Sequence, residues 1–328
     1  MKKRILSGCR ATGSVHIGNL FGTLKNWVKL QSEYDCFYEI ADLHALTTNY
    51  NNTVEMKSNI REMAIDWMVC GISIEESTIF IQSLVPEHSE LYLLLSMIVP
   101  LPWLERNPTL KEQIRDLNLQ DKVNYGLLGY PVLQAADILC YKASAVPVGE
   151  DQLPHLEITR EIARKFNSIY KPIFPEPIPL LSKSPRIPGI DGRKMSKSLN
   201  NAILINELPQ ITKEKITQAF TDPLKIHKQD KGHPDGCIVF AYHGLVNAEG
   251  IEGMKVSCTQ GKIGCVECKG RTTILLNDFL APYREKRSKI STKSIDEILI
   301  EGSRKAKKVA KATFDEVREA MQLWEWQK

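Results

Sequence analysis

The residues with the clearest chemical potential lie in the stretch GRKMSKSLNN, residues 192–201. It gathers Arg193, Lys194 and Lys197 with serine and asparagine side chains on a short segment that begins with glycine. Cationic and hydroxyl-bearing side chains at this density can hold an anion, since charged hydrogen bonds are the strong ones. The alternative for such a segment is a solvated surface turn without a ligand.

A second candidate follows the first apolar run of the chain, in the stretch ATGSVHIGNLFGTL (residues 11–24). Gly13, Gly18 and Gly22 surround His16 where a helix is predicted to begin. Glycines let a ligand approach the backbone closely, and a helix N-terminus offers unpaired N–H groups to phosphate. The stretch fits neither the dinucleotide-binding nor the Walker pattern, so alone it indicates phosphate binding only weakly.

The two segments together resemble the signature pair of the class I aminoacyl-tRNA synthetases. His16-Ile17-Gly18-Asn19 resembles the HIGH signature, and residues 194–198 match the KMSKS signature about 180 residues later. The resemblance implies that the anion is the triphosphate of ATP, accompanied by Mg²⁺. It also implies that His16, Asn19, Lys194 and Lys197 are catalytic. The residues that it assigns to ATP binding in these two motifs are Gly18, Asn19, Lys194, Met195, Ser196 and Lys197.

Three further segments resemble motifs of the tryptophanyl-tRNA synthetases, and this resemblance extends along essentially the whole chain. They are DLHALTT (42–48), YPVLQAADILCY (130–141) and VPVGEDQ (146–152). The resemblance implies that Asp137 accepts the indole N–H of tryptophan. Apolar residues flank Asp137 on both sides in the sequence, which favours a pocket over a helix surface. The amino-acid site would also contain Tyr130 and Gln152, which bind the α-amino group, together with Gln134 and His44.

The resemblance places further ATP contacts near the first and fourth apolar runs. Gly149 and Asp151 match family positions on the ribose side of ATP, and Arg10 and Thr12 lie in the first loop. Lys111 aligns with a lysine of a mobile loop that reaches the pyrophosphate and is therefore a further catalytic candidate.

Four of the eight cysteines form a distinct set, Cys237, Cys258, Cys265 and Cys268. Their pattern is C-x20-C-x6-C-x2-C, and the C-x2-C step suits two thiolates that bind one metal. Four thiolates suit either structural zinc or a [4Fe–4S] cluster, and spacing alone leaves both open. A subset of bacterial tryptophanyl-tRNA synthetases carries a nearly identical set that holds a [4Fe–4S] cluster. That resemblance favours the cluster, in a structural role near the tRNA anticodon.

The elements that position these residues are predicted by hydrophobic pattern. Residues 4–9, 36–42, 77–83 and 143–148 are apolar runs, each followed by a helical segment, which predicts a parallel sheet with crossover helices. The proline-rich stretch 171–189 is predicted to be a connector. The sequence after it is mostly helical, and Ser294 to Glu297 predict a capping box for a long last helix. We therefore expect an α/β, Rossmann-like catalytic domain over residues 1–200 and a smaller helical domain, which holds the four cysteines and binds the anticodon, over 201–328.

Charge and hydropathy are consistent with a cytoplasmic enzyme that binds nucleic acid. Residues 281–311 contain ten basic side chains against four acidic ones, which favours a polyanionic partner. A solvated helix face is the alternative, supported by the spacing of Glu301 and Lys305. The N-terminal sequence lacks the long apolar run of a signal peptide, and the segment 91–104 is too short to span a membrane.

The sequence thus predicts a tryptophan–tRNA ligase that uses ATP, tryptophan and tRNA(Trp) and, as the resemblance implies, forms a homodimer. Two rivals remain. Tyr130, Gln134 and Asp137 could also surround a phenol, as in a tyrosyl-tRNA synthetase. A nucleic-acid-binding protein descended from a synthetase is the other, and the intact lysines of the KMSKS segment argue against it.

Overall fold

The structure is a computed structural model, and it describes residues 2–116, 119, 123–181 and 187–324. Its contacts divide the chain into two compact units. Unit 1 comprises Met1–Gly13, Asn26–Lys183 and Ser291–Lys328, and unit 2 comprises Ser14–Lys25 and Ser184–Ile290. Each unit is described by itself.

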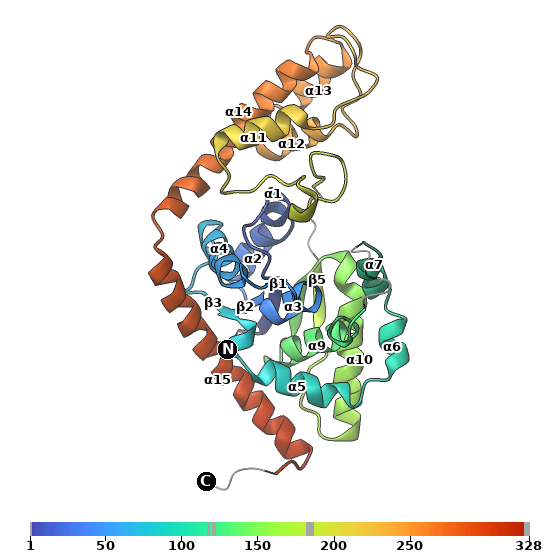
Figure 1. Cartoon of the computed structure of the whole chain (residues 1–328), viewed down its shortest axis with the longest axis vertical. Helices are drawn as coiled ribbons and strands as arrows, with labels where there is room; N and C mark the ends of the chain where they lie inside the picture. Colours follow the sequence, from blue (N-terminus) through green and yellow to red (C-terminus); the bar gives the residue numbers. More distant parts are fainter. Residues whose placement is uncertain (1, 117–118, 120–122, 182–186, 325–328) are drawn as a thin grey trace. The chain divides into compact units, whose positions relative to one another are not determined.

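Unit 1 is built on a five-stranded parallel sheet with the strand order β3-β2-β1-β4-β5 (Figure 1). The α/β, Rossmann-like class predicted from the sequence is confirmed. Parallel strands need helical crossovers and are covered on both faces, which is why their sequences are nearly continuous apolar runs. The strands are β1 (Arg4–Arg10), β2 (Asp35–Ala41), β3 (Ser77–Ile81), β4 (Ala145–Val148) and β5 (Ile178–Leu181).

The fifth strand lies inside the stretch that was predicted to be a connector. Residues Ile178 to Leu181 pair in parallel with Ala145 to Val148, and the strand contains Pro179. A proline cannot donate a hydrogen bond to a sheet, but it is tolerated in an edge strand. Because β5 is an edge strand, the proline-rich composition did not prevent strand formation, and the connector prediction was wrong for these residues.

Helices pack around this sheet, and a buried apolar core joins α5, α9, α10 and α15 with the strands. The helical segments of unit 1 are α3 (Asp42–Asn49), α4 (Met56–Val69), η2 (Gln82–Leu84), α5 (Glu87–Ser96), α6 (Leu101–Glu105), α7 (Pro108–Asp116), α8 (Tyr125–Leu128), α9 (Tyr130–Cys140), η3 (Glu150–Gln152), α10 (Leu153–Ile169) and α15 (Thr292–Ala320). The short helix α2 (Lys25–Leu30) continues from unit 2 into unit 1.

The last helix, α15, packs against the edge strand β3 (Figure 1). A Cβ on Gly302 would lie 1.9 Å from the carbonyl oxygen of Ile79, so only glycine allows this approach. The Ser303 hydroxyl accepts a hydrogen bond from the backbone N–H of Ile81 at 3.1 Å. The helix thereby covers an exposed sheet edge, which would otherwise be free to pair with another chain.

The start of α15 differs from the prediction. The helix begins at Thr292, and the Ser291 side chain caps it by accepting from the N–H of Ser294 at 3.3 Å. Serine at position 294 was predicted to be the cap, one turn too late. Both serines have the residue type of a cap, and the earlier one meets an extended backbone where the chain enters the helix.

Unit 2 is predominantly helical, with α14 as its longest element and α11 and α12 packed against it. It also contains the segments of both signature motifs. Its helical segments are α1 (Ile17–Asn19), the π-helical turn η1 (Leu20–Leu24), η4 (Lys197–Leu199), α11 (Pro209–Gln218), α12 (Ile238–Val246), α13 (Ile251–Thr259) and α14 (Cys265–Ser288).

The division by contacts differs from the single boundary predicted near residue 200. Residues 14–25 pack within unit 2 because backbone pairing joins residues 15–17 to residues 203–205, and α15 packs within unit 1 because it covers β3. None of the helices that the structure describes has the length and apolar character needed to cross a bilayer.

Candidate functional site

The HIGN segment of unit 2 forms a tight turn at the start of α1. The Nδ1 atom of His16 accepts a hydrogen bond from the backbone N–H of Asn19 at 3.2 Å, and the Asn19 side chain accepts from the backbone N–H of His16 at 3.3 Å. This reciprocal pair is a capping box, in which both residues fix the turn. A Cβ on Gly18 would lie 2.9 Å from His16 Nδ1, so the turn requires glycine there.

The ionisation state of His16 follows from its surroundings. Burial, followed by the positive charges of Lys197 and Lys194, lowers the pKa of His16 to about 4. The ring is therefore neutral near pH 7. Since Nδ1 accepts a hydrogen bond, the proton of the neutral ring is on Nε2, which can donate to an anionic oxygen.

The KMSKS loop is held beside the HIGN turn within unit 2 by Lys197 and by backbone pairing of residues 203–205, which follow the loop. His16 and Leu204 form an antiparallel bridge, and the N–H of Ile17 donates to the carbonyl of Ile203 at 2.9 Å. The Lys197 ammonium group donates to the carbonyl of Ser14 at 2.8 Å. Met195 is buried, and its sulfur lies 3.4 Å from the position of a Cβ on Gly18. Lys194 is exposed. The structure thus brings the two signature motifs together, as a shared phosphate site requires.

One residue of this loop, Asn201, was missed as a functional residue. It is buried, and its side chain accepts from the N–H of Ser196 at 2.7 Å while donating to Asp191 and to the carbonyl of Lys194. These bonds define the path of the KMSKS backbone. An asparagine three residues beyond a lysine-rich signature is a signal for such a role, because its amide can both donate and accept locally.

The predicted amino-acid site of unit 1 is organised around Asp137 on α9. This carboxylate is buried and is hydrogen-bonded to His44 on α3, to His88 on α5 and to Gln82 in η2, at 2.8, 2.6 and 2.8 Å. Burial alone would raise the pKa of Asp137, but the charge and hydrogen bonds of His44 and His88 outweigh it and lower the pKa to about 2. Asp137 is therefore an anion at pH 7.

Three members of this network, Gln82, His88 and Glu39, were not predicted. Gln82 is the first residue after β3, and His44 is the third residue after β2. Glu39 lies within β2. Polar residues that follow neighbouring parallel strands meet at the same sheet edge, so the sequence position of Gln82 was a usable signal. Glu39 sits within an apolar run, and the tertiary structure alone brings it toward His88, 3.6 Å away.

Two other predicted amino-acid contacts, Tyr130 and Gln134, lie on the same helix as Asp137, whereas the third, Gln152, lies in η3. The Tyr130 ring packs on His44 with 4.2 Å between ring centroids. Burial raises the pKa of Tyr130 to about 12, so its hydroxyl remains protonated and can donate. The side-chain oxygen of Gln134 is buried, and none of the described residues donates a hydrogen bond to it. Two candidates for ligand contact are therefore available at one turn's spacing on α9.

The residues predicted to bind the ribose form a separate cluster after β4. A Cβ on Gly149 would lie 2.7 Å from Asp151 Oδ1, and the Gln152 amide donates to the Asp151 carboxylate at 3.2 Å. Asp151 is exposed, and its carbonyl accepts from Thr109 at 2.9 Å.

Three further predicted residues lie on the first loop and on α7. Arg10 donates to the Thr48 hydroxyl at 3.2 Å, and Thr12 follows it, its N–H donating to the Arg10 carbonyl at 2.7 Å. Lys111 is exposed on α7.

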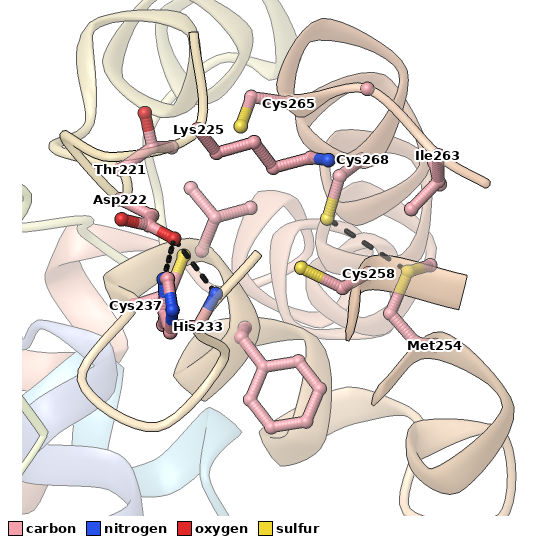
Figure 2. A pocket seen from close by; sticks show the side chains of 13 residues that line it. Thr221, Asp222, Lys225, His233, Cys237, Met254, Cys258, Ile263, Cys265 and Cys268 are labelled. Carbon is pink, nitrogen blue, oxygen red and sulfur yellow. Dashed lines mark hydrogen bonds and ion pairs between the residues drawn. The ribbon is translucent and has the colours of Figure 1, made fainter. Parts of the chain in front are cut away.

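The four cysteines of the C-terminal set line one pocket in unit 2, and Figure 2 shows their sulfur atoms around it. None of them is in a disulfide. Two come from the start of α14, one from α13 and one from the residue before α12. Burial and the neighbouring cysteines raise the pKa of Cys268 to about 11, and burial also raises that of Cys258. A bound metal ion would reverse this effect, because coordinated thiols lose their protons.

A hydrogen-bonded loop, residues 222–236, forms one wall of the thiol pocket. Lys225 is buried, and its ammonium group donates to the carbonyls of Lys228, at 2.9 Å, and of Asp230. A Cβ on Gly232 would lie 2.4 Å from the sulfur of Cys258, so the backbone is in close contact with the thiol. Cysteine thiolates are soft ligands, and a metal centre bound by four of them carries a net negative charge. The buried ammonium group of Lys225 beside the four cysteines suits such a centre. The residues therefore fit a four-cysteine metal centre.

Comparison with known proteins identifies the family. A family model described as tRNA synthetases class I (W and Y) matches residues 1–281. The chain belongs to this family. The synthetase is 48% identical to the tryptophan–tRNA ligase of Thermotoga maritima, with 98% of the chain and 99% of the relative covered. It is 43% identical to that of Aquifex aeolicus, with 98% and 100% covered.

Solved structures agree with this assignment. The tryptophanyl-tRNA synthetase of Campylobacter jejuni, solved in complex with ADP and tryptophan, superimposes with a TM-score of 0.88 at 33% identity. The match covers 98% of the synthetase and 100% of that chain. The relatives therefore match both units along their full length.

Proposed function

We infer that the chain is a tryptophan–tRNA ligase, an ATP-dependent class I aminoacyl-tRNA synthetase. It activates L-tryptophan with ATP to tryptophanyl-adenylate and pyrophosphate and then transfers tryptophan to the terminal ribose of tRNA(Trp). The observation that carries this inference is the position of the KMSKS loop beside the HIGN turn, fixed by the hydrogen bond of Lys197 to Ser14 and by the backbone pairing of residues 203–205, in a chain that is similar to tryptophan–tRNA ligases over 98% of its length.

In the first step the tryptophan carboxylate attacks the α-phosphorus of ATP in line. A new P–O bond forms as the bond to the β-phosphate breaks, and pyrophosphate leaves. We propose that His16 donates from Nε2 to a phosphate oxygen and that Lys194 and Lys197 stabilise the charge on the departing pyrophosphate. Mg²⁺, which accompanies ATP, neutralises part of the phosphate charge. Positioning and charge stabilisation supply the catalysis, so no covalent nucleophile is needed.

We also propose the remaining predicted ligand contacts of unit 1. Asp137 accepts the indole N–H, and Tyr130 and Gln152 bind the α-amino group, with Gln134 and His44 lining the same site. The buried, unpaired oxygen of Gln134 and the protonated hydroxyl of Tyr130 support these roles. The ATP contacts proposed in this unit are Arg10, Thr12, Lys111, Gly149 and Asp151.

The complete reaction is tested by charging. Purified protein is incubated with ATP, Mg²⁺, labelled tryptophan and bacterial tRNA, and acid-precipitable label is counted. We expect charging of intact tRNA and none of periodate-oxidised tRNA, which lacks the acceptor hydroxyls of the terminal ribose. Failure to charge intact tRNA, in a protein that forms the adenylate, would contradict the second step while leaving the first in place.

We propose further that the four cysteines hold a [4Fe–4S] cluster with a structural role near the tRNA anticodon. The cysteine spacing, which resembles that of bacterial tryptophanyl-tRNA synthetases that hold such a cluster, favours the cluster over zinc. The pocket contains the buried ammonium group of Lys225, which suits an anionic four-thiolate group of either kind.

The metal is identified by anaerobic purification followed by iron, sulfide and zinc assays and a visible spectrum. The cluster predicts about four irons and four sulfides per chain with broad visible absorption. One zinc in a colourless protein would replace the cluster with a redox-inert structural site and would leave the ligase assignment intact.

A homodimer is the proposed assembly. Unit 1 exposes large apolar side chains on α5, after it, on α6 and on α8, namely Leu93, Met97, Leu101 and Tyr125. Exposed apolar side chains of this kind would be buried if they lay together in an interface. Light scattering coupled to gel filtration should give twice the chain mass of 37.2 kDa, and a mass of 37.2 kDa at micromolar concentration would contradict the dimer.

A further inference from the structure

The buried network around Asp137 contains more than the proposed tryptophan contact requires. Three donors from three different elements converge on one carboxylate. His88 and Gln82 donate to Oδ1, and His44 donates to Oδ2. All four side chains are at most 4% exposed.

The direction of each hydrogen bond is fixed by the chemistry of the partners. An ionised carboxylate can only accept, so His88 carries a proton on Nδ1 and His44 carries one on Nε2. The Gln82 amide is oriented by a second bond, because its oxygen accepts the backbone N–H of His44 at 3.3 Å while its nitrogen donates to Asp137. The network therefore has one arrangement of donors.

Glu39 determines where the negative charge of the network lies. Its carboxyl group is buried and lies 3.6 Å from Nδ1 of His88. Burial raises the pKa of Glu39 well above its usual value, and the negative charges of Asp137 and Asp42 raise it further. The negative charge beside His88 is therefore assigned to Asp137, whose carboxylate lies 2.6 Å from Nδ1.

The number of acceptor positions on the Asp137 carboxylate indicates what these three hydrogen bonds do. The two oxygens of a carboxylate offer about four lone-pair positions. Two donors occupy Oδ1 and one occupies Oδ2, so a single position remains, on Oδ2. That number matches the single donor of an indole ring.

We propose that His88 is a positioning residue for tryptophan selection, which holds Asp137 so that Oδ2 presents its one free acceptor position to the indole N–H. This inference rests on the proposed role of Asp137. His88 is suited to it because both its ring nitrogens are engaged, Nδ1 by Asp137 at 2.6 Å and Nε2 by the Tyr141 hydroxyl at 2.8 Å. A fully buried ring that is held at both ends cannot turn away, whereas Nδ1 of His44 has no hydrogen-bond partner among the residues that the structure describes.

A metal site is the competing interpretation of Glu39, His88 and Asp137, since their ligand atoms lie within 4.8 Å of one another. The 2.6 Å between His88 Nδ1 and Asp137 Oδ1 is a hydrogen-bond distance. Two ligands of a tetrahedral zinc ion, with bonds of about 2.0–2.1 Å, would lie about 3.3 Å apart. The geometry favours the proton over a metal ion.

The test uses a tryptophan analogue in which sulfur replaces the ring N–H. Tryptophan-dependent ATP–pyrophosphate exchange gives kcat/KM for tryptophan and for the analogue, and their ratio measures recognition of the N–H. A site built to bind an N–H rejects an analogue that lacks it by orders of magnitude. In His88→Ala we expect the ratio to fall at least tenfold through loss of kcat/KM for tryptophan, with a change of less than threefold for the analogue.

Two variants separate positioning from folding. In His88→Asn the amide nitrogen occupies the place of Nδ1 and can still donate to Asp137, so the ratio should stay within about threefold of the wild type even where stability falls. His243→Asn is the matched control, because His243 is a buried histidine of unit 2 that bonds to Thr272 at 3.3 Å. It should lower thermal stability without changing the ratio.

The outcomes are distinct. An unchanged ratio in His88→Ala, or equal losses for both substrates, would overturn the positioning role and leave a structural one. If His88→Ala does not fold, His88→Asn decides the question. A tenfold fall of the ratio in folded His88→Asn would overturn the assignment of Nδ1 as the essential donor. A ratio like that of the wild type would support this assignment. A wild-type enzyme that does not prefer tryptophan over the analogue would instead contradict the proposed role of Asp137 itself.

Discussion

The Asp137 network of unit 1 and the thiol pocket of unit 2 are both buried clusters of polar or soft side chains, yet they differ in what completes them. Asp137 receives three hydrogen bonds from the protein itself. The cysteines line a pocket in which burial keeps two of the thiols protonated. The first site is therefore formed before its ligand arrives, whereas in the second the proposed metal would supply the bonds that join the four cysteines.

The largest effect should follow from removing the centre of the first site. Asp137→Ala leaves three buried donors without an acceptor and removes the proposed indole contact. We expect kcat/KM for tryptophan in pyrophosphate exchange to fall at least a hundredfold, in metal-loaded and metal-free protein alike. A loss below tenfold would break the claim that this carboxylate selects the substrate.

The next largest effect concerns the phosphate site of unit 2. Lys197→Ala removes a cation that lies beside the HIGN turn and that is proposed to stabilise the pyrophosphate. Adenylate formation, measured in a single turnover, should slow by more than tenfold, because the lost interaction strengthens in the transition state. An unchanged rate would show that the loop is not catalytic here.

Removing one thiol sharpens the contrast with the Asp137 site. Cys265→Ser should abolish stoichiometric iron binding and lower tRNA affinity several-fold, while tryptophan activation stays within about threefold of the wild type. Iron per chain, filter binding of tRNA and pyrophosphate exchange are measured on one preparation. Normal charging and normal tRNA affinity without the metal would contradict the proposed structural role.

A further prediction concerns acid stability. The pKa of His16 is about 4 in the folded chain, and 6.5 is its ordinary value. The unfolded chain therefore binds more protons between these two values, so the free energy of unfolding falls as the pH drops from about 6.5 to 4. Between pH 7.5 and 5 the wild type should lose about 2 kcal/mol more than His16→Gln, measured by urea unfolding. An equal loss in both proteins would contradict the neutral state of His16.

The smallest effect is expected at the wall of the thiol pocket. Lys225→Met removes the ammonium group that bonds two carbonyls of the loop 222–236. We expect loss of iron in air to be two- to threefold faster, with tryptophan activation unchanged. Lys228→Met, which removes an exposed lysine of the same loop paired with Glu267 at 3.4 Å, is the matched control and should retain iron like the wild type.

The same contrast explains what the sequence could predict. Motifs that are local in sequence, such as the HIGN turn and the KMSKS loop, were found because a few adjacent residues make up each one. The four cysteines were found as a set because few other residue types bind soft metals, and the structure places them around one pocket. The Asp137 network was found only in part, because its donors come from α3, η2 and α5, which tertiary structure alone brings together.

The errors in the fold have similar causes. The strand β5 was missed because proline signals outweighed a short apolar run, although an edge position tolerates proline. The start of α15 was placed at Ser294 rather than Ser291 because two serines one turn apart have the same capping propensity. The basic residues of α15 are partly paired within the helix, since Arg304 bonds Glu301 and Lys311 bonds Asp315, so its charge is less available than composition indicated.

The most direct test of the account is the amino-acid preference of pyrophosphate exchange. The ratio of kcat/KM for tryptophan to that for tyrosine is measured on the purified wild-type enzyme with saturating ATP and Mg²⁺. We predict a preference for tryptophan of at least a thousandfold, because the proposed site offers one acceptor position of Asp137 to a ring donor. Equal exchange with tyrosine, or a preference for it, would contradict the assignment of the Asp137 site.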